Sequence, residues 1–160
     1  MYVVKKLRSI VAFIVFGALS FSVAAQSTNL SIENYNSVTD ERLINPEDHN
    51  WLSYRGTLDG WGYSSLDEIS ASNVSELEPV WSFSTGVLGG HESPPIVNDG
   101  VMFITTPGNL LYAIDAASGD LLWRYQHDLP ATYIAFHRTN RGVALYGDKV
   151  YMATLDARVI

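Results

Sequence analysis

From residue 80 onward, short apolar runs alternate with clusters of turn-forming residues. The runs occupy residues 80–84, 101–105, 110–114 and 121–125, and Gly, Asn, Asp or Pro stands between most of them. Runs of about five residues bounded by turn residues have the length of β-strands rather than helices. The pattern therefore predicts antiparallel strands joined by tight turns.

The stretch "AIDAASGDLLW" (113–123) shows one such hairpin in full. Two apolar runs flank a turn in which Asp115 can accept hydrogen bonds from the turn backbone and Gly119 can supply a positive φ. The returning run closes on Trp123.

This unit recurs along the chain. Trp81 closes "LEPVWSFSTG" as Trp123 closes "GDLLWRYQHD", and "GDKVYMATLDARVI" (147–160) echoes "DGVMFITTPGNLLYAI" (99–114). A period of about 40 to 50 residues with roughly four short strands is typical of β-propeller blades. We assign Trp81 and Trp123 to packing between neighbouring blades. The expected fold class is all-β, a partial propeller with room for about two blades where propellers close with about four to eight, so the chain resembles the amino-terminal piece of a longer protein.

The chain before residue 80 is less regular. Residues 26–45 are predicted to form an extended arm, and residues 46–160 the propeller part. Asn45-Pro46 predicts a short helix that starts there and runs through Trp51. Residues 54–65 are expected to be a glycine-rich loop, and residues 72–77 one helical turn.

Residues 1–25 have the layout of a secretory signal peptide. Basic residues at positions 5, 6 and 8 precede an apolar run of residues 10–23, and small residues precede Gln26. The run is shorter than the roughly 20 residues that span a bilayer, so cleavage after Ala25 is favoured over retention as an amino-terminal anchor. Either outcome places the body outside the cytoplasm, and retention would associate it with the membrane periphery.

Charge and cysteine content exclude several functions. The leader holds three of the ten basic residues and none of the seventeen acidic ones, so the remainder is strongly acidic and nucleic acid is not expected as a partner. The chain has no cysteine, which excludes disulfides, cysteine-ligated metals and lipoprotein acylation.

Three stretches resemble the pyrroloquinoline quinone (PQQ) dependent alcohol dehydrogenases, the family of quinoproteins that includes methanol and ethanol dehydrogenases. They are "WLSYRGTLDGWGYSSLDEISASNVSELEPVWSF" (51–83), "GHESPPIVNDGVMFITTPGNLLYAIDAASGDLLWRY" (90–125) and "NRGVALYGDKVYMATLDARVI" (140–160). The repeat alone resembles any PQQ-type propeller, whereas His-Glu-x-x-Pro together with Asn-Arg-Gly is more selective.

The resemblance implies an eight-bladed periplasmic enzyme that oxidises a primary alcohol. It implies PQQ in the central funnel with a calcium or lanthanide ion, hydride transfer to the quinone, and a cytochrome c-type electron acceptor. Glu92 matches the family's glutamate at the cofactor periphery, and Arg141 matches its arginine directed at the quinone oxygens. The metal ligands and the catalytic aspartate would lie beyond Ile160, so the 160 residues alone are expected to be inactive.

Two departures from the family pattern are visible. Where the family often has adjacent cysteines that cover the quinone ring, this chain has Ala135-Phe136 followed by His137, and a flat side chain of Phe136 or His137 could cover the ring instead. Gly62 stands where the family usually has an arginine, so a local salt bridge is expected to be absent.

Other polar residues have simpler interpretations. His91, His127 and His137 lack the spacing of a metal site and are expected to be loop residues. Asp115 and Asp156 fall in hairpin turns, where aspartate has a structural role.

Three alternatives to an alcohol dehydrogenase remain open at this point. A non-enzymatic propeller could act as an envelope interaction scaffold, although the absence of cysteine disfavours its usual lipoprotein form. A sugar or polyol dehydrogenase would be a variant within the family. A truncated remnant would have no function of its own.

Overall fold

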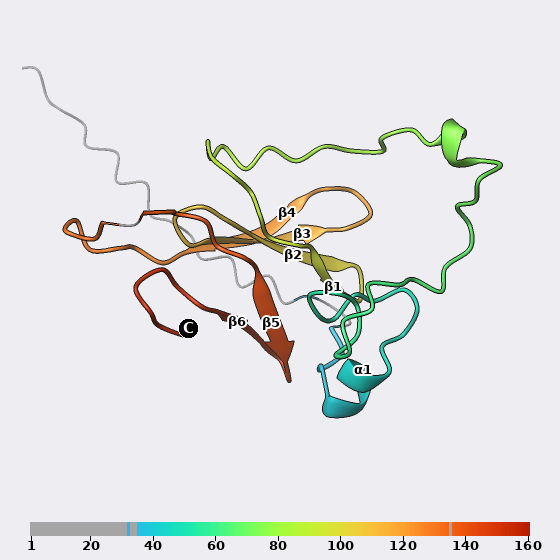
Figure 1. Ribbon diagram of the computed structural model, residues 1–160, viewed down its shortest axis with the longest axis horizontal. Helices are drawn as coiled ribbons and strands as arrows, with labels where there is room; N and C mark the ends of the chain where they lie inside the picture. The colour runs from blue at the N-terminus through green and yellow to red at the C-terminus, as the bar shows by residue number, and fades with distance from the viewer. Residues whose placement is uncertain (1–31, 33–34, 135) are drawn as a thin grey trace, which may run out of the picture.

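The computed structural model describes residues 32, 35–134 and 136–160, which form two antiparallel sheets and a short helix (Figure 1). The predicted signal peptide and residues 26–31 of the predicted arm lie outside these described residues.

The first sheet has four strands in the order β1-β2-β3-β4, each antiparallel to the next. They are β1 (Ile96–Asn98), β2 (Val101–Thr106), β3 (Leu110–Asp115) and β4 (Leu121–Gln126). The predicted runs 101–105, 110–114 and 121–125 are therefore confirmed as strands. Gly119 has a φ of +79° in the turn between β3 and β4, as its place in the sequence predicts.

The second sheet begins with β5 (Val143–Tyr146) and β6 (Lys149–Met152). Met152 and Ile160 exchange backbone hydrogen bonds of 2.9 and 3.1 Å, so the chain turns back along β6 as it does between β2 and β3. The echo between 99–114 and 147–160 thus reflects two copies of the same hairpin.

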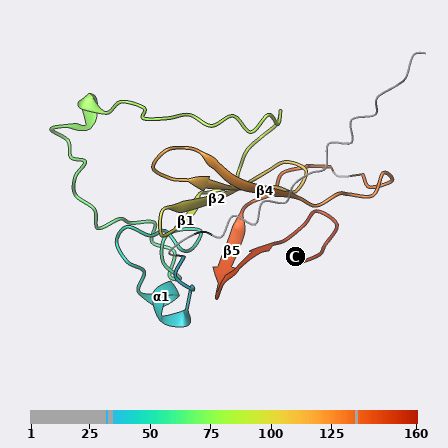
Figure 2. The same ribbon diagram turned by 180° about the vertical axis from the view of Figure 1, so that it is seen from behind.

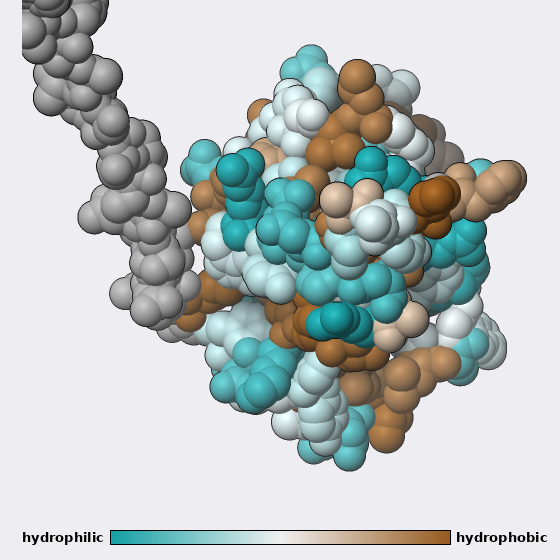
Figure 3. Space-filling view, turned by 90° about the vertical axis from the view of Figure 1, so that its left-hand side faces the viewer, coloured by the Kyte–Doolittle hydropathy of each residue, from teal (hydrophilic) through white to brown (hydrophobic). Residues whose placement is uncertain are grey.

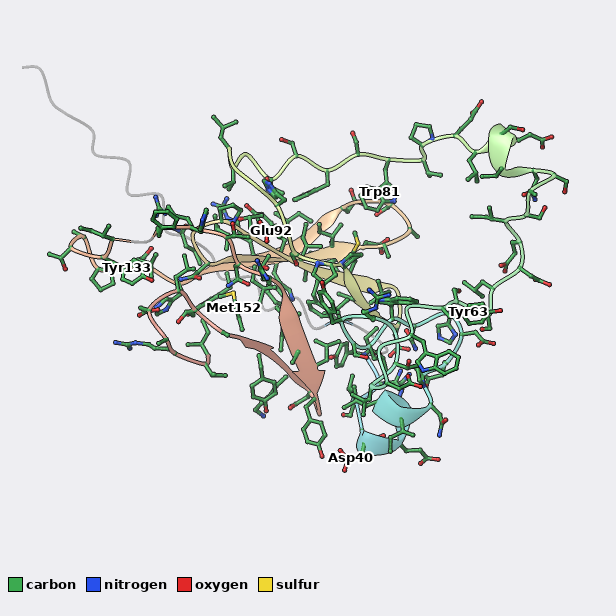
Figure 4. The ribbon with its side chains drawn as sticks, in the orientation of Figure 1. Asp40, Tyr63, Trp81, Glu92, Tyr133 and Met152 are labelled. Carbon is green, nitrogen blue, oxygen red and sulfur yellow. The ribbon has the colours of Figure 1, made fainter. Side chains whose placement is uncertain are left out.

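The core lies between the two sheets. Phe103, Leu111 and Ala113 of the first sheet form one buried cluster with Leu145 and Met152 of the second. These residues are apolar because each face must be shielded from water, and each sheet shields the other. Figure 4 labels Met152 on β6, beside the first sheet.

Trp123 occupies the predicted position between the sheets. Its ring lies 5.9 Å from that of Phe103, and Trp123 and Val150 of β6 both pack against the core cluster. An aromatic side chain of this size supplies much of the apolar area that such a junction buries.

The predicted strand at residues 80–84 is wrong. The segment is extended and runs above the first sheet in both views of Figures 1 and 2, but no ladder includes it. Its alternate side chains contact the sheet: the Trp81 indole donates to the Ala116 carbonyl at 3.1 Å, and Phe83 meets Tyr112 edge to face. A strand also needs a backbone partner, and within the described chain none lies alongside this segment.

The predicted helix start at Asn45-Pro46 is also wrong, as is the extended form of the arm next to it. The helix α1 runs over Asp40–Ile44, and the side chain of Thr39 caps its start. Asn45 is instead the residue that ends α1, with a φ of −129°. The residue before a proline avoids the helical conformation, so Pro46 stops the preceding helix rather than starting a new one.

Backbone pairing links the amino-terminal half to the rest of the described chain. Val38 and Trp51 form single antiparallel bridges with Gly147 and Val97, which attach this half to both sheets. The expected helical turn is the 3₁₀ helix η1 (Val74–Glu76). Within the described residues, no helix is both long enough and apolar enough to cross a bilayer.

Ala157 gives a prediction on stability. It has a φ of +62° in the turn that follows β6, a conformation that costs a non-glycine residue about 1–2 kcal/mol. We expect Ala157→Gly to raise the free energy of unfolding by about 1 kcal/mol, measured by urea denaturation. The control is Ala153→Gly, which lies outside the positive-φ region and is expected to lower stability by about 0.5–1 kcal/mol. Equal effects of the two changes would contradict the assignment of strain.

Candidate functional site

Three connecting segments meet at one end of the first sheet: residues 86–95 before β1, the turn between β2 and β3, and residues 127–142 between β4 and β5. They surround a groove of about 480 Å³. Its lining includes Leu88, Pro107, Phe136, His137 and Arg138. Figure 3 views the molecule from the side that carries residues 127–142, and apolar patches lie between polar ones there.

The structure brings Glu92 and Arg141 together. Arg141 Nη2 lies 3.2 Å from Glu92 Oε2, across two segments that precede the first strands of the two sheets. The arginine side chain is 80% exposed and the glutamate 49% exposed. An ion pair this exposed contributes little to stability, because water and salt screen it. Because both side chains are open to solvent, a ligand could reach their charged groups. Figure 4 labels Glu92 where its segment reaches the sheet.

Asn140, next to Arg141, is buried and anchors this segment. Its Nδ2 donates to the Ala153 carbonyl at 2.9 Å and to Asn109 Oδ1 at 3.3 Å. Its Oδ1 accepts from the Gly142 N–H at 3.1 Å. The sequence drew attention to Asn140 only as part of the Asn-Arg-Gly motif and gave no sign of these contacts.

Phe136 and His137, the two residues suggested as a cover for the quinone ring, line the groove. Their rings are 4.8 Å apart in a T-shaped arrangement, and Phe136 is 96% exposed. An aromatic side chain left this open at a groove is suited to contact a flat ligand.

His127 and Asp156 form a pair that no pattern in the sequence predicts. His127 Nε2 lies 3.0 and 3.1 Å from the two carboxylate oxygens, and both side chains are largely buried. The Thr154 hydroxyl donates to the same carboxylate at 2.6 Å, and Arg158 lies 3.2 Å from it. Hydrogen bonds from Thr154 and then His127 lower the pKa of Asp156 to about 2. The pair joins the end of β4 to the turn after β6.

Residues 127–142 make a further contact with the turn that follows β6. The hydroxyl of Tyr133 donates to the carbonyl of Leu155, and Figure 4 labels Tyr133 well out on this segment. The Arg138 carbonyl accepts from the Gly108 N–H at 2.9 Å. Residues 127–142 are therefore held by both sheets.

Asp115 has the structural role expected of it. Its carboxylate accepts from the backbone N–H groups of Ser118 at 2.8 Å and Ala117 at 2.9 Å. These bonds, Ser118 first, lower the pKa of Asp115 because they stabilise the charged form. His91 is likewise a loop residue, with ring nitrogens 2.9 Å from Thr85 Oγ1 and 3.0 Å from the Gly89 carbonyl.

Gly62, one of the two departures from the family pattern, lies under the side chain of Arg55. A Cβ at Gly62 would be 2.9 Å from Arg55 Nη2, and Arg55 Nε donates to the Gly60 carbonyl at 2.8 Å. A guanidinium from elsewhere in the loop thus lies beside the position where the family usually has arginine. Among the described residues, no cluster of three or more histidine or acidic side chains could hold a metal ion.

Comparison with known proteins identifies the family. Residues 51–160 match the model of the glucose/ethanol/alcohol dehydrogenase β-propeller domain, the PQQ family. The chain is 38% identical over 147 residues to the quinoprotein ethanol dehydrogenase of Pseudomonas aeruginosa, covering 89% of this chain and 23% of that protein. It is 36% identical over 143 residues to the dehydrogenase subunit of the quinone alcohol dehydrogenase of Gluconacetobacter polyoxogenes, covering 86% of this chain and 19% of that subunit.

Solved structures agree with the sequence relatives. A quinohemoprotein alcohol dehydrogenase of Pseudomonas putida superposes with a TM-score of 0.71 at 38% identity, covering 78% of this chain and 19% of that one. A europium-containing methanol dehydrogenase superposes with a TM-score of 0.70 at 32% identity, covering 76% and 22%. The chain thus spans about a fifth of the length of these relatives. The two sheets are propeller blades, and the chain belongs to the PQQ-type glucose/ethanol/alcohol dehydrogenase β-propeller family.

Proposed function

We propose that the protein is a PQQ-dependent dehydrogenase of primary alcohols, in which this chain supplies part of the cofactor site. The observation that carries the proposal is the Glu92–Arg141 ion pair, which joins two of the segments that border the groove although neither residue lines it. Its two residues are the ones that the family motifs His-Glu-x-x-Pro and Asn-Arg-Gly assign to the cofactor. Export to the periplasm, a cytochrome c-type electron acceptor and a calcium or lanthanide ion belong to the same proposal.

The side chains at this end fit PQQ, which is a flat quinone with three carboxylates. Guanidinium groups bind carboxylates with two parallel hydrogen bonds, and Arg141 is open enough to do so. Arg138 lines the groove, and no carboxylate of the described chain lies within ion-pair distance of it. Phe136 and His137 add aromatic surface for the ring.

The role of the chain's own residues is to bind and orient the cofactor. PQQ, when bound, accepts the hydride that leaves the alcohol. Arg141 would hold the cofactor oxygens and stabilise negative charge as it develops on them, while Glu92 would contact the cofactor periphery. The described residues contain no set of ligands for the metal ion, so we assign none of them to it.

A cofactor titration tests the proposal. In the protein expressed from its complete reading frame, we expect PQQ to bind and to quench tryptophan fluorescence in a calcium or lanthanum buffer. Arg141→Ala is expected to weaken binding roughly ten- to hundredfold, because it removes a charge-assisted hydrogen bond. Arg141→Lys is expected to recover only part of the loss, since lysine lacks the planar fork.

The matched control is Arg124→Ala, which removes an exposed arginine on β4, away from the groove. We expect this change to leave PQQ binding unaltered. If the unmodified protein neither binds PQQ nor reduces a dye when an alcohol is added, the proposed function is wrong. If Arg124→Ala and Arg141→Ala weaken binding equally, Arg141 does not contact the cofactor.

A further inference from the structure

Thr105 on β2 is connected to both segments of the candidate site. Its side chain is only 1% exposed. The Thr105 N–H donates to Ser93 Oγ at 3.0 Å, and its own Oγ1 accepts from the Gly142 N–H at 2.9 Å. Ser93 directly follows Glu92 and Gly142 directly follows Arg141, so one buried residue bonds to the side chain beside Glu92 and to the backbone beside Arg141.

The two segments also contact each other at this point. A Cβ on Gly142 would lie 3.4 Å from Pro94 Cδ and 3.5 Å from Ser93 Oγ, which is ordinary van der Waals contact, so the two segments are direct neighbours here. Gly142 has a φ of +109°, which a residue with a side chain rarely adopts. The backbone of Arg141 is thereby fixed relative to that of Glu92.

The ion pair does not provide this positioning itself. Both side chains are exposed, and an exposed pair of long side chains is weakly held in any one geometry. The Gly142 N–H is held by two partly buried acceptors, Thr105 Oγ1 at 2.9 Å and Asn140 Oδ1 at 3.1 Å, and loss of the shorter bond weakens that hold. The separation of the two charged groups therefore depends on the buried contacts beneath them.

From these contacts we infer that Thr105 is a positioning residue for the cofactor site, acting through Ser93 and Gly142 to set Arg141 against Glu92. The inference rests on the proposed function, since the charged groups that Thr105 positions are those of Arg141 and Glu92, which are assigned to PQQ. Thr105 itself touches neither charged group in the structure, so its effect on the cofactor is transmitted by the backbone of the two segments.

The test compares three variants of the protein expressed from its complete reading frame. Thr105→Val keeps the branched shape and removes the hydroxyl, Thr105→Ser keeps the hydroxyl, and Thr106→Val removes the neighbouring buried hydroxyl. Thr106 is as buried as Thr105 and next to it, so Thr106→Val removes the same group from the same place as Thr105→Val. Thr106 Oγ1 makes only a 3.5 Å contact, with the Pro107 carbonyl. We expect Thr105→Val to weaken PQQ binding about tenfold and the other two to stay near the unmodified protein.

A double-mutant cycle separates positioning from a general structural effect. If Thr105 acts through Arg141, adding Thr105→Val to Arg141→Ala should cause no further loss of PQQ affinity. The inference is overturned if the two losses add, or if Thr105→Val and Thr106→Val weaken binding equally. Should Thr105→Val fail to fold, Ser93→Ala removes the other contact of Thr105 from a partly exposed position and is expected to give a smaller loss with the same dependence on Arg141.

Hydrogen exchange keeps this inference separate from the proposed function. In the protein without PQQ, the peptide that covers residues 139–145 is expected to exchange faster in Thr105→Val than in Thr106→Val, because the Gly142 N–H loses an acceptor. If the unmodified protein binds no PQQ, the proposed function fails, while this comparison still decides whether Thr105 holds the Arg141 segment. Equal exchange in the two variants would overturn the inference.

Discussion

Replacing Gly119 with alanine is expected to lower the free energy of unfolding by about 3 kcal/mol. Two effects combine at this position. Its φ of +79° strains any residue with a Cβ by about 1–2 kcal/mol. The added methyl would also lie 2.6 Å from Trp81 Cδ2 and 2.7 Å from Cε3, so the indole must move, at a further cost of about 1–3 kcal/mol. Urea denaturation of the alanine variant beside the unmodified protein measures the sum.

Gly100 provides a matched control for the backbone effect alone. Its φ is +77°, and a Cβ there would meet nothing within 4 Å. Gly100→Ala should therefore cost only about 1–2 kcal/mol. Combining Gly119→Ala with Trp81→Ala should cost less than the sum of the two single changes, because the clash is already removed. If Gly100→Ala and Gly119→Ala cost the same, Trp81 does not press on the turn in solution.

This contact also shows what the sequence could predict and what it could not. A positive φ at Gly119 follows from local turn chemistry, since a few neighbouring residues determine it. The repeat predicts that Trp81 packs between blades, whereas the contacts seen within the described residues are with Ala116 and Gly119 of the turn after β3. Its contact with the turn after β3, however, joins residues far apart in the sequence, and no local pattern encodes that distance.

The difference between local and long-range contacts also explains the two wrong predictions about the fold. Strands β2 to β4 were predictable because adjacent hairpins pair through short turns. Residues 80–84 have the apolar character of a strand, but a strand exists only where another backbone lies alongside. Pro46 has two opposite effects: it favours the first turn of a helix that would start there, and it keeps the preceding residue, Asn45, out of the helical conformation. In the structure the second effect prevails.

The candidate site was predictable only through the family motifs. Glu92 and Arg141 carry no local signal of partnership, and the resemblance alone selected them. The contacts that hold their segments join residues that are 37 positions apart for Thr105 and Gly142, and 29 apart for His127 and Asp156. Such contacts depend on how the two blades pack, so residue type and spacing could not reveal them.

Asn109 is the second position at which a single change should be severe. It is fully buried, in the turn between β2 and β3. Its Oδ1 accepts from the Leu155 N–H at 3.1 Å and from Asn140 Nδ2 at 3.3 Å, which connects the first blade to the second. Asn109→Ala removes both acceptor contacts and places alanine at a φ of +62°. We expect a loss of about 3 kcal/mol in the free energy of unfolding, about 1 kcal/mol for each lost hydrogen bond and about 1 kcal/mol for the strained backbone; Asn140 Nδ2 keeps the Ala153 carbonyl as its partner.

Asn109→Gly separates the hydrogen bonds from the backbone strain. Glycine adopts the positive φ freely, so only the loss of the carboxamide remains, and we expect about 2 kcal/mol by the same denaturation measurement. Ala157 already holds a φ of +62° in the second blade, which shows that alanine at such a turn position is compatible with folding. If Asn109→Gly is as stable as the unmodified protein, the bonds from Asn109 to Asn140 and Leu155 do not hold the blades together. In that case the apolar cluster between the sheets and contacts such as His127–Asp156 and Gly142–Thr105 must provide the attachment.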